Sequence, residues 1–473
     1  MKEELINKKT IRGQTTLEII IALFVMMVTV SAIIQVSFWN QSIAIDIELS
    51  NQALSIARAE LENAQSVGKK DFNSLSSSTK TEGIYSKEII VSSIDSYTKK
   101  VITKISWQVE TLRPQKIELT TLVTNYSNLI ASGGDTGGGN PSGNWQSIST
   151  LGSLDLGPGI SANDLDVLNK IVYIAGQASV ASKPDFFIVN ATDGANPFIV
   201  SSINTGPGLH TVDVAYNYAY VGNQNLDAQL QIIDVSNSAA PVLIASFKLP
   251  GVSGSGAIGQ SIFYNSGKIY IGTKEASGPE FHIIDVTNPA NPVSLGSREI
   301  GDDVNSIYVR GNIAYVAIDD FDDESELKVF DVSIPSAIVL LGGFIAPGNS
   351  EDGKSLDLVG NDLYLGRTVG GNHTNHHEFH IVDVSNPATI TNLGSKDLAV
   401  DLNDLKVRGS LAFFATSDSN KEFQVWNISD KTNSTLWSSF NFPQVATGID
   451  YEDNFVYVSV RSNDGLRILT SNP

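Results

Sequence analysis

Hydrophobic positions divide the chain into a helical N-terminal part and a long part made of short strands. Residues 17–38 are apolar apart from Glu18 and a few Ser, Thr and Gln residues. A run of this length spans a bilayer as one α-helix. Helical periodicity continues through residues 41–66, where apolar residues mark one face and charged residues occupy the others. Gly68 is expected to end this helix.

The pattern changes to strand-like runs after residue 67. Val101, Ile105 and Val109 mark one apolar face within residues 88–125, and a second run follows the turn at Pro114. Residues 132–144 then read SGGDTGGGNPSGN, a stretch without apolar residues that contains six Gly. Such a composition is typical of a flexible tether. We therefore expect two separate folded bodies.

One five-residue phrase recurs seven times after the tether. The copies end at residues 190, 234, 285, 331, 383, 427 and 470, with a mean step of about 47 residues. Each copy follows an aromatic-rich strand and a shorter apolar strand, and precedes a turn and a fourth strand. Four-stranded repeats of this period are typical of a β-propeller.

The phrase usually ends in Asp or Asn. Such side chains accept hydrogen bonds from nearby backbone amides and start turns, so we interpret them as structural and not as catalytic. These repeat residues are Asn190, Asp234, Asp285, Asp331, Asp383 and Asn427.

The two ends of the repeat region predict how the ring closes. The last copy stops soon after its third strand, whereas an unassigned strand, residues 146–156, precedes the first copy. Its Leu-Gly-Ser at residues 151–153 matches the fourth-strand phrase at residues 295–297. We expect this strand to complete the last blade and to remove exposed sheet edges. The predicted fold is mainly β: a seven-bladed β-propeller of four-stranded blades behind a transmembrane helix and a small β-sheet.

The repeated phrases resemble LVIVD-repeat β-propellers over residues 145–473. The segment RGQTTLE at residues 12–18, followed at once by the apolar helix, resembles the leader of type IV pilins and pseudopilins. The helix and small sheet together look like a minor pilin.

The pilin resemblance implies specific processing and assembly steps. A prepilin peptidase would cut between Gly13 and Gln14, and the new N-terminal residue, Gln14, would be methylated. The Glu18 carboxylate would pair with the N-terminal amine of a neighbouring pilin-like subunit, which neutralises a charge in an apolar setting. Gln14 departs from the aromatic residue usual in that family. The alternative is a plain signal-anchor helix with Glu18 at the membrane interface.

These patterns divide the chain into five segments. They are a prepilin-like leader (1–13), a transmembrane pilin-like helix (14–67), a small pilin-like β domain (68–130), a Gly-rich linker (131–144) and a seven-bladed LVIVD-like propeller (145–473). The short basic N-terminal tail favours a cytoplasmic start. We therefore expect a single-pass bacterial membrane protein with an extracytoplasmic propeller, displayed on a pilus or the cell surface.

Charge and cysteine content narrow the possible partners. The net charge of the chain is -20, and residues 131–473 hold 17 basic against 38 acidic residues. This acidity argues against nucleic acid or an anionic membrane as a partner of the propeller. The absence of Cys excludes disulfides and thiolate chemistry.

Two loops carry residue types that bind metals. Imidazole and carboxylate groups suit a transition metal in one, and hard carboxylate oxygens suit Ca²⁺ in the other. Neither loop has the spacing of a known metal motif, so the alternatives are a strand histidine beside a polar loop, and a solvated acidic loop. The candidate ligands are His373, His376, His377 and Glu378 in the first loop, and Asp319, Asp320, Asp322 and Asp323 in the second.

Loop lengths predict where a ligand binds. The long segments 251–259, 319–326 and 370–378 connect strands on one face, whereas the opposite face has tight turns, and long loops on a rigid scaffold usually carry binding. We expect a non-enzymatic adhesion or recognition protein that needs no cofactor and binds an extracellular protein or glycan, with the prepilin peptidase and other pilin-like subunits as further partners. The alternatives are a membrane-anchored, metal-dependent propeller hydrolase or lyase, and a structural pilus-associated subunit.

Overall fold

A computed structural model of the chain describes residues 7–70, 72, 75–93, 98–108, 114–124, 140–180, 182–319, 325–347, 351–370 and 376–472. Most of the predicted linker, residues 131–139, therefore lies outside the described residues. Contacts divide the chain into two compact units, Met1–Tyr126 and Ser127–Pro473. Each unit is described by itself.

The first unit begins with one long helix, α1 (Asn7–Lys70). Its segment Ile20–Ser37 has a mean hydropathy of 2.4, and none of its residues is buried within the protein. A helix of this kind near the N-terminus occurs in membrane anchors and in signal sequences alike. The backbone is helical at Gly13, Gln14 and Glu18, whose side chains lie outside the described part.

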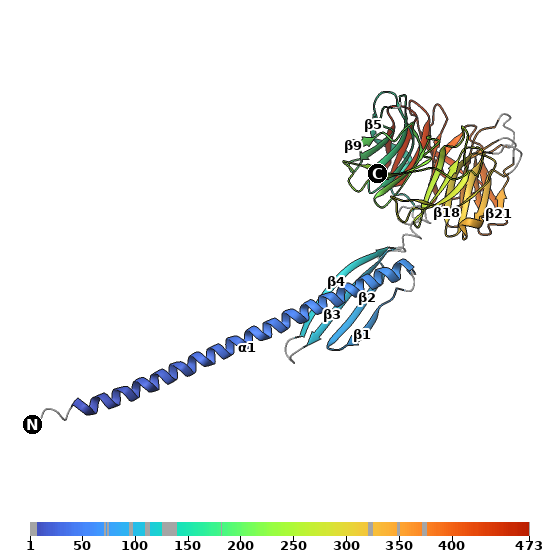
Figure 1. Cartoon of the computed structure of the whole chain (residues 1–473). Helices are drawn as coiled ribbons and strands as arrows, with labels where there is room; N and C mark the ends of the chain where they lie inside the picture. The colour runs from blue at the N-terminus through green and yellow to red at the C-terminus, as the bar shows by residue number, and fades with distance from the viewer. Residues whose placement is uncertain are drawn as a thin grey trace, which may run out of the picture. The chain divides into compact units, whose positions relative to one another are not determined.

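The C-terminal half of α1 packs on a four-stranded antiparallel sheet of order β1-β2-β3-β4 (Figure 1). The prediction that Gly68 ends the helix was wrong, because α1 continues to Lys70. Gly68 has a different role: a Cβ atom at this position would lie 2.4 Å from Cγ1 of Val123 on the sheet. Its missing side chain therefore permits the close approach of helix and sheet. The four strands are β1 (Ser78–Glu82), β2 (Tyr85–Ser93), β3 (Thr98–Gln108) and β4 (Pro114–Thr124).

Residues 144–472 form seven further four-stranded antiparallel sheets among the described residues. The first three contain β6 (Ile160–Leu168), β7 (Ile171–Ala178), β8 (Phe186–Asn190) and β9 (Phe198–Ile203); β10 (Leu209–Ala215), β11 (Tyr218–Asn223), β12 (Leu230–Asp234) and β13 (Val242–Phe247); and β14 (Gly259–Asn265), β15 (Lys268–Thr273), β16 (Phe281–Asp285) and β17 (Val293–Arg298). The next two contain β18 (Val304–Arg310), β19 (Ile313–Ile318), β20 (Leu327–Asp331) and β21 (Val339–Phe344), with a short 3₁₀ helix at Pro335–Ala337; and β22 (Gly353–Val359), β23 (Asp362–Arg367), β24 (Phe379–Asp383) and β25 (Thr391–Lys396). The last two contain β26 (Leu402–Arg408), β27 (Leu411–Thr416), β28 (Phe423–Asn427) and β29 (Thr435–Phe440); and β30 (Ala446–Glu452), β31 (Phe455–Val460), β32 (Leu466–Asn472) and β5 (Asn144–Leu154).

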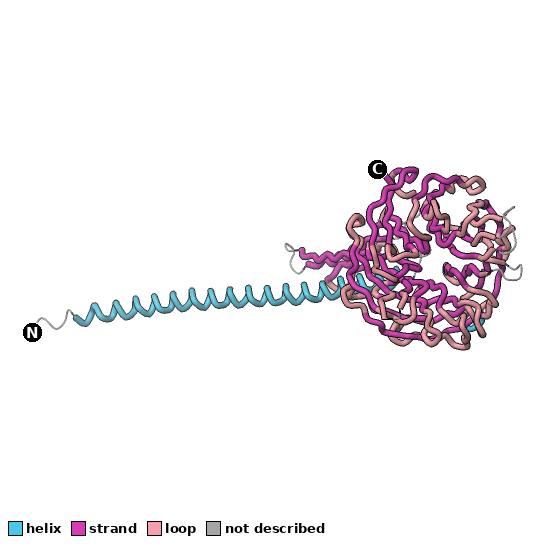
Figure 2. Tube along the Cα trace, turned by 90° about the horizontal axis from the view of Figure 1, so that it is seen from above, coloured by secondary structure: helices cyan, strands magenta, loops and turns pink. Residues whose placement is uncertain are grey.

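The seven sheets lie side by side around a common centre (Figure 2). The first strand of each sheet contacts the first strand of the next, and β30 contacts β6. Each sheet packs on its neighbour through apolar side chains, as where Leu165 and Val172 of one sheet meet Ile468 of another. The third strands supply much of this core because they are buried along most of their length.

The predicted pairing between the start and the end of the repeat region is confirmed. Strand β5 pairs with β32, from Asn144 beside Asn472 to Leu154 beside Leu466. Trp145, within β5, is only 1% exposed and packs edge-on against Phe413, with the ring centres 4.8 Å apart. This strand therefore joins the N-terminal end of the unit to its C-terminal end.

Candidate binding surface

The two ends of the sheets differ in the length of their connections. First and second strands are joined by two residues in every sheet, as at residues 311–312 between β18 and β19. The connections on the opposite face include residues 248–258 and 368–378, which are much longer. We call this second face the long-loop face. The sequence predicted long loops on this face and tight turns on the other, and the connections between the strands have these lengths.

Turns on the other face use the repeated Asp or Asn of the third strand. The side-chain Oδ1 atom accepts a hydrogen bond from the backbone N–H two residues later in six sheets, at 2.8–3.0 Å. These side chains therefore start turns. The six residues are Asn190, Asp234, Asp285, Asp331, Asp383 and Asn427.

The first strands are connected around the centre by hydrogen bonds from bulge residues. Each first strand has a register shift near its start, and such a bulge re-aims the side chain of the extra residue. Asn163 Nδ2 donates to Leu209 O at 2.7 Å, and Asn403 Nδ2 donates to Ala446 O at 2.8 Å. These bonds join successive first strands near the long-loop face.

Partly buried aspartates form a second set of bonds between first strands. Asp213 accepts from the Tyr264 N–H at 2.6 Å, and Asp404 accepts from the Ile449 N–H at 2.8 Å. Burial raises the pKa of Asp213 to about 6 and that of Asp404 to about 7. Lys406 lies among these carboxylates, with Nζ 3.5 Å from Asp450 Oδ1. The centre of the unit is therefore polar and mainly acidic.

In six sheets, a buried acid or amide side chain directly precedes the third strand. It connects loops of the long-loop face by a hydrogen bond. Its side-chain oxygen accepts a backbone N–H twenty residues later, in the connection that leaves the fourth strand. Each such bond ties together two loops of the same sheet. The six residues are Asp185, Gln229, Glu280, Glu326, Glu378 and Glu422. Sequence reasoning missed this role, although the position directly before each repeated phrase was a usable signal.

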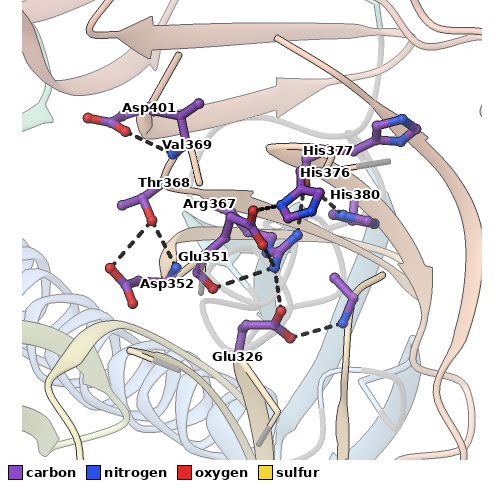
Figure 3. A network of polar contacts seen from close by, with 11 residues as sticks. Glu326, Glu351, Asp352, Arg367, Thr368, Val369, His376, His377, His380 and Asp401 are labelled. Atoms are coloured by element: carbon purple, nitrogen blue, oxygen red, sulfur yellow. Dashed lines mark hydrogen bonds and ion pairs between the residues drawn. The ribbon is translucent and has the colours of Figure 1, made fainter. Parts of the chain in front are cut away.

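Arg367 joins the two loops singled out by the sequence (Figure 3). Its Nη2 atom lies 2.5 Å from Glu326 Oε1 and 3.0 Å from Glu351 Oε2, and all three side chains are fully buried. Nη1 donates to the carbonyl oxygen of His377 at 3.1 Å. Glu326 ends the acidic loop and His377 lies in the histidine-rich loop, so one guanidinium connects both.

The described histidines of this loop contact different partners. His376 Nδ1 contacts Glu351 Oε1, whereas His377 Nδ1 lies 2.6 Å from the Ser395 hydroxyl. His380 Nε2 donates to the His377 carbonyl at 2.9 Å, and burial lowers the pKa of His380 to about 3. The ring of His380 is therefore neutral near pH 7 and belongs to the sheet, as expected for a strand side chain.

The candidate metal ligands are only partly described. His373, Asp320, Asp322 and Asp323 lie outside the described residues. Asp319 accepts from Asn305 Nδ2 at 2.6 Å, and Glu378 uses Oε2 to bind the Leu398 and Ala399 N–H groups. Within the described ranges, no three His, Asp or Glu side chains are grouped as a metal site. Metal binding at either loop stays a prediction.

The chain contains LVIVD repeats. The LVIVD repeat model matches residues 210–248, 269–298, 301–345 and 374–397, each of which ends in or just after the fourth strand of a sheet. No curated protein matches the chain.

Solved structures with a similar fold have low sequence identity. A chain in the crystal structure of a mitotic checkpoint complex is 15% identical, with a TM-score of 0.51, and the match covers 72% of this chain and 99% of that one. The WD40 β-propeller domain of Doa1 is 12% identical over 69% of this chain and 97% of that one, with a TM-score of 0.49. BamB from Moraxella catarrhalis is 12% identical over 69% and 98%, with a TM-score of 0.43. Together with the repeats, the first likeness identifies a mainly β, propeller-like fold and does not indicate a function.

Proposed function

We propose that this protein is a bacterial cell-surface adhesion or recognition protein without enzymatic activity. A type IV pilin-like N-terminal segment would anchor it in the membrane or in a filament. A closed, seven-bladed propeller would bind an extracellular protein or glycan through the long-loop face.

The observation that carries this proposal is the place where the tether enters the second unit. Asn140 Oδ1 accepts hydrogen bonds from the Ser410 N–H at 2.8 Å and from its hydroxyl at 3.0 Å. Ser410 lies in the two-residue turn between β26 and β27, on the face opposite the long loops. The described end of the tether, residues 140–144, therefore begins on the face opposite the long loops.

Ring closure is supported by bonds between the last and first sheets. Thr447 Oγ1 donates to Ala162 O at 3.1 Å, and the two oxygens of Glu452 accept from Asn169 N at 2.7 Å and Lys170 N at 2.5 Å. Other neighbouring first strands are joined in the same way, by a hydrogen bond from the side chain of the bulge residue to a backbone carbonyl of the next sheet. In a closed ring, the first strand of every sheet has a neighbouring first strand on both sides. The seven sheets would then be the seven blades of the propeller.

The first unit supports the pilin-like assignment. An exposed apolar helix half is followed by a half that packs Ala53 and Ala57 against Ile105 and Trp107 of an antiparallel sheet. The apolar half suits a membrane or the interior of a filament. Co-expression with a prepilin peptidase should shorten the chain by residues 1–13, as measured by intact mass. Deletion of residues 13–18 should abolish this cleavage, whereas an unchanged mass of the unaltered chain would contradict pilin-like processing.

Adhesion can be tested with matched substitutions on the two faces. Ile345 is 64% exposed in a long-loop connection, and Ile334 is 61% exposed in a turn on the opposite face. Ile345→Asp should reduce binding of the full-length protein to a panel of host-surface proteins and glycans, and Ile334→Asp should not. Antibody labelling of the propeller on intact cells and on sheared filaments would establish display. Equal effects of the two substitutions would contradict the proposed face, and labelling only after lysis would contradict the proposed location.

A further inference from the structure

Two sheets contain a group of three buried polar atoms that have no hydrogen-bond partner among the described residues. In the β14–β17 sheet these atoms are Thr273 Oγ1, Glu280 Oε1 and His282 Nδ1. All three residues have no exposed surface. Buried polar groups are rarely left without a partner, because desolvation without compensation is costly.

The strand register places the three side chains on one face of the sheet. Ile271 pairs with His282 and Gly272 with Phe281, so Thr273 lies opposite Glu280. Side chains two residues apart on a strand share a face. Directly opposite Cβ atoms lie about 5 Å apart, and next neighbours on one face lie about 7 Å apart. One small molecule can therefore reach all three atoms.

The β22–β25 sheet repeats this arrangement with one substitution. Arg367, Glu378 and His380 occupy the corresponding positions, and the atoms without a partner are Arg367 Nε, Glu378 Oε1 and His380 Nδ1. In both sheets the other oxygen of the glutamate accepts two backbone N–H groups, from Ile300 and Gly301 in the first sheet. In both sheets, the Oε1 atom of the glutamate therefore has no hydrogen-bond partner among the described residues.

The free atoms also agree in hydrogen-bonding type. His282 Nε2 lies 2.7 Å from the Pro279 carbonyl, which only accepts, so Nε2 carries the proton and Nδ1 is an acceptor. Burial lowers the pKa of His282 to about 4, which keeps the ring neutral at pH 7. The glutamate oxygen is a second acceptor. Thr273 Oγ1–H in one sheet, and Arg367 Nε–H in the other, supplies one donor.

We propose that each of these two sites binds one structural water molecule. A water molecule donates two hydrogen bonds and accepts at least one, which matches two acceptors and one donor. A cation is disfavoured because the guanidinium of Arg367 supplies the donor in the second sheet. The bound water would hold the glutamate in the position from which it binds the loop after the fourth strand.

Two other sheets show how the same positions are satisfied without water. In one, Asn223 Nδ2 donates directly to Gln231 Oε1 at 2.8 Å. In another, Gln424 Nε2 lies 3.5 Å from Thr416 Oγ1, which also donates to the Lys421 carbonyl at 3.0 Å. These sheets have Gln where the two water sites have His. They serve as internal controls.

A crystal structure of the full chain in detergent, at a resolution that shows ordered water, tests this proposal. We expect one density peak within about 2.7–3.2 Å of the three atoms in each of the two sheets, and none at the Gln231 and Gln424 positions. Direct bonds among Thr273, Glu280 and His282 would overturn the proposal. A peak with anomalous signal, or with distances near 2.1 Å, would also overturn it, because it would indicate a metal ion.

A variant gives a second, independent test. Thr273→Val removes the donor in the first sheet and leaves the second sheet unchanged. The peak beside Glu280 should be lost or displaced in this variant, while the peak beside Glu378 stays. Retention of an unmoved peak beside Glu280 would contradict the assigned role of Thr273. If the variant does not crystallise, its melting temperature should still fall relative to that of Ser434→Ala, a change at a buried serine outside both sites.

Discussion

Asp450 accepts a hydrogen bond from the backbone N–H of Val167 at 3.0 Å, across 283 residues of sequence. Asp450 lies on β30 in the last sheet and Val167 on β6 in the first sheet. Asp166, at the same level of β6, accepts in turn from the Val214 N–H of the next sheet at 2.6 Å. The interface between the last and first sheets therefore uses the same bond as an ordinary neighbouring pair.

Trp145 is predicted to be a main stabilising residue of strand β5. Trp145→Ala removes a buried ring that packs on Phe413, and we expect a loss of about 3–5 kcal/mol in the free energy of unfolding. Denaturant unfolding of the full chain measures this loss. Leu436→Ala is the control, because Leu436 is 40% exposed on the neighbouring outer strand. Similar losses in both variants would show that Trp145 has no special role.

Arg367 is predicted to stabilise the long-loop face by forming ion pairs with two buried carboxylates. Arg367→Met leaves Glu326 and Glu351 as buried charges, and should cost about 3–5 kcal/mol in unfolding free energy. Adding Glu326→Gln and Glu351→Gln to this variant should restore part of the loss, because the uncompensated charges are then absent. A triple variant less stable than Arg367→Met would contradict this account.

Asp404 is predicted to make stability fall as the pH rises towards neutrality. Its pKa is about 7 in the folded protein, against 3.8 for the ordinary group, so the folded state binds the proton more tightly between these values. The resulting stabilisation is complete at low pH and is lost as the pH rises through 7. Asp404→Asn should remove this dependence, a difference of about 1–4 kcal/mol between pH 4 and pH 8. Unfolding at several pH values measures it, and an unchanged slope in the variant would refute the assignment.

His282 is predicted to make stability fall as the pH decreases, which is the opposite of the effect of Asp404. Its pKa of about 4 in the folded protein lies below the ordinary 6.5, so protonation favours the unfolded chain. Stability from this residue is present above pH 6.5 and is lost as the pH falls towards 4. His282→Gln keeps a donor for the Pro279 carbonyl and should reduce the acid sensitivity by up to about 3 kcal/mol. Asp383, a half-buried turn residue of another sheet, provides the control, since Asp383→Asn should leave the histidine-dependent loss in place.

Local features of the fold were predictable from the sequence. Short, repeated sequence motifs indicate the repeat period and the turn-forming Asp and Asn residues. A motif of the same kind indicates the strand that pairs with β32. The strand β1 was missed because its sequence, STKTE, has no apolar residue and every side chain is exposed. Hydrophobic alternation cannot identify a strand of this kind.

Features that depend on packing between distant segments were not predictable. Arg367 ends an ordinary second strand, and only the arrangement of two sheets places Glu326 and Glu351 beside it. Likewise, the bulges that aim Asn163 and Thr447 at the next sheet arise from strand register, which a single strand does not reveal. Glu378 was considered as a metal ligand, whereas its Oε2 atom binds the loop after the fourth strand of its own sheet.

The pairing of β5 with β32 has a consequence for biogenesis. Of the strands in the propeller-like unit, a ribosome makes β5 first and β32 last, so this unit cannot complete its final sheet until residues 466–472 have been synthesised. Until then the edges of β31 and β5 that pair with β32 are available to chaperones, proteases and neighbouring chains. A product truncated even shortly before Leu466 would keep nearly every repeat and still lack the partner strand of Trp145.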